Sequence, residues 1–444
     1  AADAVIHTTD LDCGQVFAHL PEAMQRGLID EREIDEALAR LLTIRFRLGM
    51  FDPEENDPYA TLPYSVLESP AHKAHALRLA QESMVLLKND GILPLQHNLT
   101  RIVVLGPNAD NPEVQLGNYN GFPSEIVTPL EGIRAKTGAE VLYLQASDYT
   151  EATCADGEID RALEGADLAI FVGGISPRLE GEEGDAGRNA PEGFAGGDRT
   201  SIRLPRAQTE VMRHIHEAGI PLVFVSMSGS ALAFPWEAEH ADAILQAWYG
   251  GQAAGTAVAD ILWGDCNPSG RLPVTFYADD SQLPDFTDYS MRGRTYRYFA
   301  GEPLFPFGFG LSYSTFAYDP PVCRPRRPRT GEPITITTRV RNTSDRTGEE
   351  VVQLYLCHPD APEPKPIRAL KGVRRITLRP GEAQTVEFTL MPRDLALVQP
   401  DGRSVCAPGT IRCYIGGAQP DASPESERRS CPIRISGTAK VLPR

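Results

Sequence analysis

Five short apolar runs recur between residues 100 and 250, and they constrain the fold more than any other feature of the sequence. They are 101–108, 141–144, 166–172, 222–227 and 243–248. Helical patterns fit between several of them, notably at 206–218, which begins after Pro205, and at 253–263. Strands that alternate with helices favour a mostly parallel sheet covered on both faces. We therefore predict an α/β sandwich domain over residues 97–277.

A second pattern begins past Tyr277. Residues 278–318 hold scattered Gly, Pro and aromatic residues with little periodicity, which indicates an irregular connector. Short alternating runs follow, separated by Asn, Asp, Gly and Pro turns; they are 334–340, 351–356, 385–390 and 410–415. This pattern is typical of an all-β sandwich. We predict such a domain over residues 319–444, and modules of this kind usually serve a structural or interaction role.

The first part of the chain is predicted to be helical. In residues 1–51, Asp30 is a candidate N-cap with Glu33 three residues later, and apolar residues follow at helical spacing. Residues 52–96 contain several prolines and then a second amphipathic pattern from about Ala71 to Leu87. We expect a linker followed by one helix in that segment.

An acidic cluster follows the apolar run 166–172. Glu180, Glu182 and Glu183 lie just past the predicted strand, at the sheet edge where open α/β proteins bind ligands. Three carboxylates so close together repel one another, and contact with an apolar surface would raise the pKa of at least one. A raised pKa suits a carboxylic acid that donates a proton near neutral pH. Charge clusters on loops are usually only solvated, so the residues alone leave both interpretations open.

Bulk properties exclude several classes of partner. The formal net charge of −17 disfavours nucleic acid and anionic membrane surfaces. No apolar run approaches the roughly 18 residues of a membrane span. Neither a GxGxxG after the first strand nor a GxxxxGK[ST] pattern occurs, so nucleotide binding gains little support. We predict no nucleic-acid or membrane partner.

The eight cysteines do not predict a metal site. None of them forms a close pair at zinc-ligand spacing, so we predict no metal and no cofactor. Five fall in the last part of the chain, at Cys323, Cys357, Cys406, Cys413 and Cys431. An oxidising compartment would permit disulfides there, with a connectivity that sequence cannot give.

Several long motifs resemble glycoside hydrolase family 3. Those that resemble its second domain are Ser83 to Leu95, Val104 to Ala109, Leu116 to Tyr119, Ala247 to Gly255 and Asn267 to Pro273. Phe305 to Tyr313 resembles the family's connector into a fibronectin type III-like module. Leu370 to Val373 and Leu378 to Glu382 resemble that module itself. The resemblance therefore implies an α/β sandwich followed by a fibronectin type III-like sandwich.

The start of the chain is most similar to the β-xylosidase branch of that family. Thr9 to Gly14 resembles the segment near the end of the N-terminal (β/α)8 barrel, so residues 1–51 are expected to be its remnant. The resemblance implies that this chain lacks the rest of the barrel, which would be its missing partner. The aspartate nucleophile and the cysteine that would bond to Cys13 belong to that missing part. We expect an apolar patch around Leu38, Leu42 and Phe46, where the barrel would pack.

The resemblance also implies residue roles. Members use a retaining mechanism in which an aspartate attacks the sugar and a glutamic acid protonates the leaving oxygen. Relatives show Glu-x-Glu ahead of an Asp-Arg pair, and this alignment makes Glu182 the acid/base and Glu180 a sugar-contacting or pKa-tuning neighbour. The segment from Glu183 to Gly197 is longer than in many relatives, so Glu180 or Glu183 stay alternatives.

Three further residues have implied roles near that loop. Asp198 and Arg199 are expected to anchor it through hydrogen bonds to the backbone or to each other. Tyr119 is a candidate for stacking near the sugar, and a tyrosine packed beneath the loop is the alternative.

The resemblance implies hydrolysis of terminal, non-reducing β-linked sugars, with β-D-xylosidase activity foremost. The substrates would be short oligosaccharides or aryl glycosides; β-glucosidase and α-L-arabinofuranosidase activities are the alternatives. A non-catalytic carbohydrate-binding or scaffold chain that pairs with a separate barrel chain is the hypothesis from another class. The resemblance also implies a periplasmic or secreted location, and a homodimer stays open.

Overall fold

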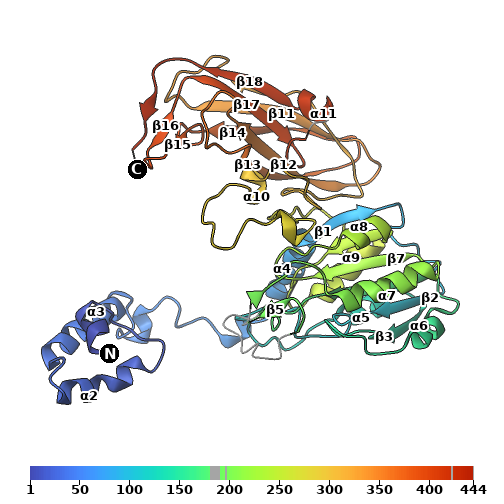
Figure 1. The fold of residues 1–444 in the computed structure, drawn as a ribbon, viewed down its shortest axis with the longest axis horizontal. Coiled ribbons are helices and arrows are strands. Elements are labelled where there is room, and N and C mark those ends of the chain that lie inside the picture. The colour runs from blue at the N-terminus through green and yellow to red at the C-terminus, as the bar shows by residue number, and fades with distance from the viewer. Residues whose placement is uncertain (181–190, 196–197, 422–423, 444) are drawn as a thin grey trace. The chain divides into compact units, whose positions relative to one another are not determined.

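The computed structural model describes residues 1–180, 191–195, 198–421 and 424–443, and Glu182 and Glu183 lie outside them. The chain divides into two compact units, residues 1–69 and 70–444 (Figure 1). Within the described residues, no helix combines the length and apolarity that a membrane span requires.

The first unit is helical. It contains α1 (Ala2–Ile6), α2 (Leu20–Gln25) and α3 (Glu31–Arg47), with short 3₁₀ turns at Val16–His19, Glu54–Asn56 and Tyr64–Val66. The predicted N-cap of α3 is confirmed: Asp30 accepts a hydrogen bond from the Glu33 amide, and the Glu33 carboxylate accepts one from the Asp30 amide. These reciprocal bonds satisfy backbone donors that the first turn would otherwise leave unpaired.

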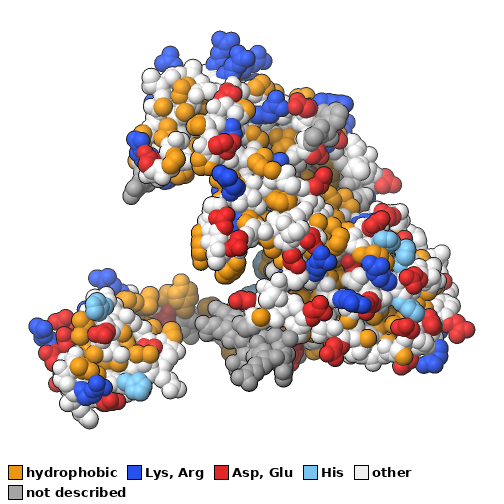
Figure 2. Space-filling model, in the orientation of Figure 1, with side chains coloured by type: hydrophobic (Ala, Val, Ile, Leu, Met, Phe, Trp, Pro, Cys, Tyr) orange, Lys and Arg blue, Asp and Glu red, His pale blue; other side chains and the backbone are white. Residues whose placement is uncertain are grey.

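The core of the first unit is small, and its surface is apolar in places. Its buried apolar side chains are Val5, Ala23, Ile29 and Ala37. As expected, the side chains of Leu38 and Phe46 are exposed, at 47% and 63%, whereas Leu42 is half-buried. Further exposed apolar residues are Ile44, Leu48, Met50 and Phe51. Hydrophobic side chains are visible on the surface of this unit in Figure 2.

A six-stranded, mostly parallel sheet forms the centre of the α/β domain, as predicted. Its strands run in the order β1-β8-β7-β4-β2-β3. Their bounds are β1 (Val85–Asn89), β2 (Arg101–Leu105), β3 (Glu140–Leu144), β4 (Leu168–Gly174), β7 (Leu222–Met227) and β8 (Ala243–Gln246). All neighbours are parallel except β1 and β8, which are antiparallel.

The helix predicted from Ala71 to Leu87 is wrong at its C-terminal end. Helix α4 (Pro70–Ser83) ends earlier, and the chain continues as strand β1. Met84 to Leu87 are all buried, and Val85 pairs with Gln246 of β8. Hydrogen bonds to the sheet and burial on both faces therefore outweigh the local helical spacing.

Helices cover both faces of this sheet (Figure 1). Helices α4, α5 (Pro129–Lys136) and α9 (Ala254–Trp263) pack on one face, whereas α6 (Asp156–Leu163) and α7 (Arg206–Glu217) pack on the other, followed by the short α8 (Pro235–His240). Helices α5 and α9 approach closely at Gly132 and Gly255. A Cβ added at Gly132 would lie 2.1 Å from the carbonyl oxygen of Gly255, so no larger residue fits there.

The connector and the fibronectin type III-like sandwich follow. The connector contains a 3₁₀ turn (Asp280–Gln282) and α10 (Thr295–Tyr298). One sheet of the sandwich has β9 (Phe316–Tyr318), β10 (Val322–Arg324), β11 (Ile334–Asn342) and β14 (Ala383–Leu390). The other has β13 (Ala369–Leu378), β12 (Gly348–Cys357), β17 (Gly409–Gly416) and β18 (Ser430–Ile435). A small sheet of β15 (Leu397–Val398), β16 (Ser404–Cys406) and β19 (Lys440–Val441), and helix α11 (Pro424–Arg428), complete it.

A buried ion pair joins the two domains of the second unit. Arg271, which follows α9, donates to the carboxylate of Glu350 on β12 over 3.1 Å, and their side chains are only 9% and 4% exposed. Arg271 also donates to the carbonyl oxygen of Gly417 over 2.9 Å, and Tyr318 donates to Glu350 over 2.6 Å. Because each charge has several partners, the pair is a specific contact between the domains.

Candidate active site

The end of β4 is held by one buried side chain of α7. Gln208, which is fully buried, accepts a hydrogen bond from the Gly174 amide over 2.7 Å and donates to the Gly174 carbonyl over 2.7 Å. Its amide group also donates to the carbonyl oxygen of Tyr149 over 2.9 Å. These bonds fix the direction in which the chain leaves the sheet toward the predicted site.

Glu180 lies six residues after the end of β4, and three groups donate hydrogen bonds to its carboxylate. The Tyr249 hydroxyl donates over 2.5 Å, the Gly229 amide donates over 3.1 Å, and the Ser230 hydroxyl also donates. Gly229 and Ser230 follow β7, and Tyr249 follows β8. We call Glu180 and these three donors the Glu180 anchor. Because β4, β7 and β8 are parallel neighbours, the anchor lies where their carboxyl ends meet.

Arg199, which follows the acidic cluster along the chain, also contacts the anchor. It lies on the short hairpin of β5 (Phe194–Ala195) and β6 (Asp198–Arg199). Its guanidinium donates to the Ser230 hydroxyl oxygen over 2.9 Å and to the carbonyl oxygens of Ala231 and Ser201 over 3.0 and 3.2 Å. These are the backbone contacts expected of a loop anchor. Ser230 therefore links Glu180 and Arg199, which flank the residues that include Glu182.

Electrostatics favour a neutral phenol in the anchor. Burial, together with the negative charge of Glu180, raises the pKa of Tyr249 far above its ordinary value. The Tyr249 hydroxyl therefore stays protonated and donates a hydrogen bond to the Glu180 carboxylate. Burial lowers the pKa of Arg199, and the charges of Glu180 and Asp280 oppose that shift. An arginine keeps its charge under such conditions, so it complements Glu180.

Tyr119 lies on a segment beside the chain that leads to Glu180. Its backbone has a φ of 55°, and its side chain is 92% exposed. Its neighbours Asn118 and Asn120 line a pocket of about 470 Å³, and Ser176 and Pro177 line the same pocket. The structure thus brings the two predicted segments together. The roles of Glu182, Glu180 and Tyr119 in catalysis and substrate binding stay predictions.

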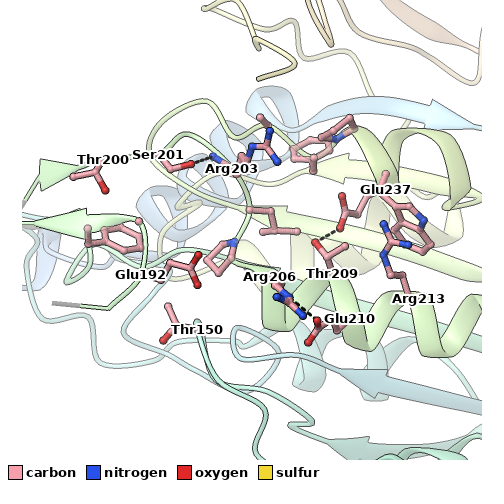
Figure 3. A pocket seen from close by; sticks show the side chains of 18 residues that line it. Thr150, Glu192, Thr200, Ser201, Arg203, Arg206, Thr209, Glu210, Arg213 and Glu237 are labelled. Carbon is pink, nitrogen blue, oxygen red and sulfur yellow. Dashed lines mark hydrogen bonds and ion pairs between the residues drawn. The ribbon is translucent and has the colours of Figure 1, made fainter. Parts of the chain in front are cut away.

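A second, larger pocket of about 760 Å³ lies beside α7 (Figure 3). Its lining includes Glu192, Arg203 and Arg206, together with Thr209 and Glu237. Figure 3 shows Thr209 facing Glu237, and the hydroxyl donates to the carboxylate over 2.6 Å. Burial raises the pKa of Glu237. The residues of the Glu180 anchor do not line this pocket.

No group of three or more His, Cys, Asp or Glu side chains in the described part of the chain is placed to hold a metal ion. The predicted absence of a metal and of a cofactor stays a prediction.

Comparison with known proteins identifies the class and then the family. Residues 84–313 match the glycosyl hydrolase family 3 C-terminal domain, and residues 350–419 match the fibronectin type III-like domain. The class is that of glycoside hydrolases built from an α/β sandwich and a β-sandwich. The chain belongs to glycoside hydrolase family 3.

Relatives in this family carry two kinds of name. The chain is 32% identical to a xylan 1,4-β-xylosidase of Xylanibacter ruminicola over 88% of this chain and 62% of that protein. It is 34% identical to a periplasmic β-glucosidase of Salmonella typhimurium over 90% of this chain and 56% of that protein. The solved structure of a family 3 exo-β-xylosidase in complex with a xylobiose aziridine probe matches with a TM-score of 0.83 and 27% identity, over 99% of this chain and 58% of that one. The chain thus spans little more than half the length of these proteins.

Proposed function

We propose that this chain is the C-terminal part of an exo-acting, retaining β-glycosidase, of the β-xylosidase type, and that it supplies Glu182 as the general acid/base. The observation that carries the proposal is the Glu180 anchor. It holds the backbone two residues before Glu182 at the carboxyl ends of three parallel strands. Family membership and the names of the relatives support the reaction class.

The proposed chemistry needs two carboxyl groups. A carboxylate nucleophile attacks the anomeric carbon while the acid/base protonates the glycosidic oxygen, and the same residue then activates the water that releases the sugar. The two carboxyl groups lie about 5 Å apart in retaining enzymes. We propose that Glu182 provides one of them and that a barrel segment provides the other.

The sugar and the location are proposed on the same basis. A xylosidase and a glucosidase are both among the relatives, at similar identity to this chain. We favour xylose because Thr9 to Gly14 resembles the β-xylosidase branch of the family. Arabinose is the remaining alternative. One relative is named periplasmic, which supports a periplasmic or secreted location.

The test separates acid/base catalysis from any other contribution of the acidic residues. In the protein expressed with its barrel, Glu182→Gln should lower kcat/KM for an alkyl or 4-nitrophenyl β-xyloside by about 10²–10⁴-fold. It should have a much smaller effect on formation of the glycosyl-enzyme from a 2,4-dinitrophenyl xyloside, because that leaving group departs without protonation. Azide should restore turnover of the activated substrate and give a xylosyl azide.

Matched variants decide which carboxylate has the role. Glu183→Gln is one residue away and should keep most of the activity under the proposal. If Glu183→Gln shows the azide rescue instead, Glu183 is the acid/base and the assignment of Glu182 is wrong. If neither variant changes the rate, Glu182 and Glu183 are both excluded and Glu180 is the remaining alternative. If the protein with its barrel hydrolyses no aryl glycoside, the non-catalytic hypothesis is favoured. Parallel assays with aryl β-glucoside and α-L-arabinofuranoside decide the sugar.

A further inference from the structure

Two cysteines face one another on neighbouring strands of the fibronectin type III-like sandwich. Cys413 on β17 and Cys431 on β18 are direct partners in the antiparallel register. Opposite residues of antiparallel strands project their side chains on the same face of a sheet. Here that face is the core of the sandwich, against which both side chains pack. The two residues are free thiols in the structure.

The register satisfies the backbone requirement of a disulfide. Opposite residues in an antiparallel pair have Cα atoms about 4.5–5.5 Å apart. Disulfides are formed across Cα separations of about 4.4–6.8 Å. A bond between Cys413 and Cys431 therefore needs only side-chain rotation, without movement of either strand.

The two thiols differ in exposure and in acidity. Cys413 is completely buried, whereas Cys431 is partly exposed. The interaction between the two thiols raises the pKa of Cys413 and lowers the pKa of Cys431. Burial adds to the raised pKa of Cys413. The more accessible thiol is thus also the more acidic one, which suits it to react first with an external disulfide.

Two other cysteines of this domain, Cys323 and Cys357, are less suited to that reaction. Burial raises the pKa of Cys323, on β10, to about 11, and burial also raises the pKa of Cys357. Cys357 lies opposite Arg412 rather than opposite a cysteine. Cys323 still lies close enough to the pair to influence the pKa of Cys413, so it is the competitor that the test must separate.

We propose that Cys413 and Cys431 are a dithiol site that oxidises to a cross-strand disulfide. The oxidant is a disulfide, either a small molecule such as oxidised glutathione or the disulfide of a thiol–disulfide oxidoreductase. The Cys431 thiolate attacks one sulfur of the oxidant and releases the first thiolate, which leaves a mixed disulfide on Cys431. Cys413 then loses its proton, attacks the Cys431 sulfur and releases the second thiolate. Two electrons pass to the oxidant, which leaves as two thiols.

The bond would tie down an outer strand. Strand β18 is the last strand of the sheet β13-β12-β17-β18, so β17 is its only partner within that sheet (Figure 1). A disulfide closes the chain between β17 and β18 into a loop and limits the freedom of the unfolded state. The oxidised domain should therefore unfold at a higher temperature than the reduced one.

The test uses the purified chain in glutathione buffers, followed by alkylation and digestion with trypsin without reduction. Cleavage after Arg412, Arg428, Arg429 and Arg434 places Cys413 in the peptide 413–428 and Cys431 in the peptide 430–434. Oxidised glutathione should yield these two peptides as one linked species, and dithiothreitol should separate them. The melting temperature of the oxidised chain should exceed that of the reduced chain by roughly 5–10 °C.

Matched variants make the test specific. Cys323→Ser should form the linked species as the wild type does, whereas Cys431→Ser should not form it and should lose the difference in melting temperature. Cys413→Ser should accumulate glutathione on Cys431, because the resolving thiol is gone. If both residues remain alkylated in oxidised glutathione, or if Cys431 is linked to the peptide that contains Cys323, the proposal is wrong.

Discussion

The Glu180 anchor predicts a large effect from a small substitution. Glu180→Gln keeps the shape of the side chain but removes the charge that accepts three hydrogen bonds and faces Arg199. A hydrogen bond to a charged group contributes about 1.5–3 kcal/mol, and a neutral amide retains only part of that. Because Glu180 is half-buried, we expect the free energy of unfolding of the α/β domain to fall by about 2–3 kcal/mol.

The sequence offers a selective assay for this domain. All three tryptophans, Trp236, Trp248 and Trp263, lie within it, so their fluorescence during urea denaturation reports on the α/β domain and not on the β-sandwich. Stability should be measured at neutral pH.

Two further variants test the reasoning. Tyr249→Phe removes one donor and should cost less than Glu180→Gln, and the double variant should cost less than the sum because the two groups share a bond. Glu113→Gln is the control: its ion pair with Arg178 is exposed, and its loss should change stability by less than about 1 kcal/mol. If Glu180→Gln destabilises no more than Glu113→Gln, the anchor does not hold the site as argued.

Three other predictions test the packing and the charges. Gly132→Ala should destabilise the α/β domain by about 1–3 kcal/mol in urea denaturation, because its Cβ would overlap α9, whereas Gly157→Ala, with open space around its Cβ, should not. Arg271→Met should cost about 3–5 kcal/mol because it leaves the buried Glu350 charge without an opposite charge, and Glu350→Met in the same chain should restore part of the loss in calorimetry. Burial lowers the pKa of His358 to about 4. The unfolded chain therefore binds more protons between pH 6.5 and pH 4, so stability should fall as the pH falls through that range, and His358→Gln should flatten the dependence.

The sequence was enough to predict the sheet and the strand end after which Glu180 lies. The apolar runs of β4 and β7 and the Asp30 cap of α3 are local patterns with a direct physical meaning, and the structure has each of them. The order of the acidic cluster after β4 was also enough to place Glu180 at the carboxyl edge. Such features can be predicted because each depends on residues that are neighbours along the chain.

The partners of Glu180 could not be predicted from the residues. Gly229, Ser230 and Tyr249 lie 49 to 69 residues from Glu180 along the sequence, and no local periodicity marks them as its partners. These residues come together because the strands β8, β7 and β4 are adjacent in that order in the sheet. This order is a property of the whole sheet. Strand β1 was missed for a related reason: only its antiparallel partner β8 distinguishes it from the last turn of a helix.

The origin of the Glu180 contacts indicates which part of the protein would position each carboxyl group in the proposed mechanism. All of its donors come from loops that follow strands of one sheet, and Arg199 adds a further contact from the same domain. The backbone at Glu180 is therefore held by contacts within the α/β domain. In the proposed mechanism the nucleophile comes from a barrel, so the two carboxyl groups would be positioned by separately folded parts. Substitutions in the anchor should then slow the steps that need proton transfer. They should have a smaller effect on the rate of nucleophilic attack when the leaving group needs no proton.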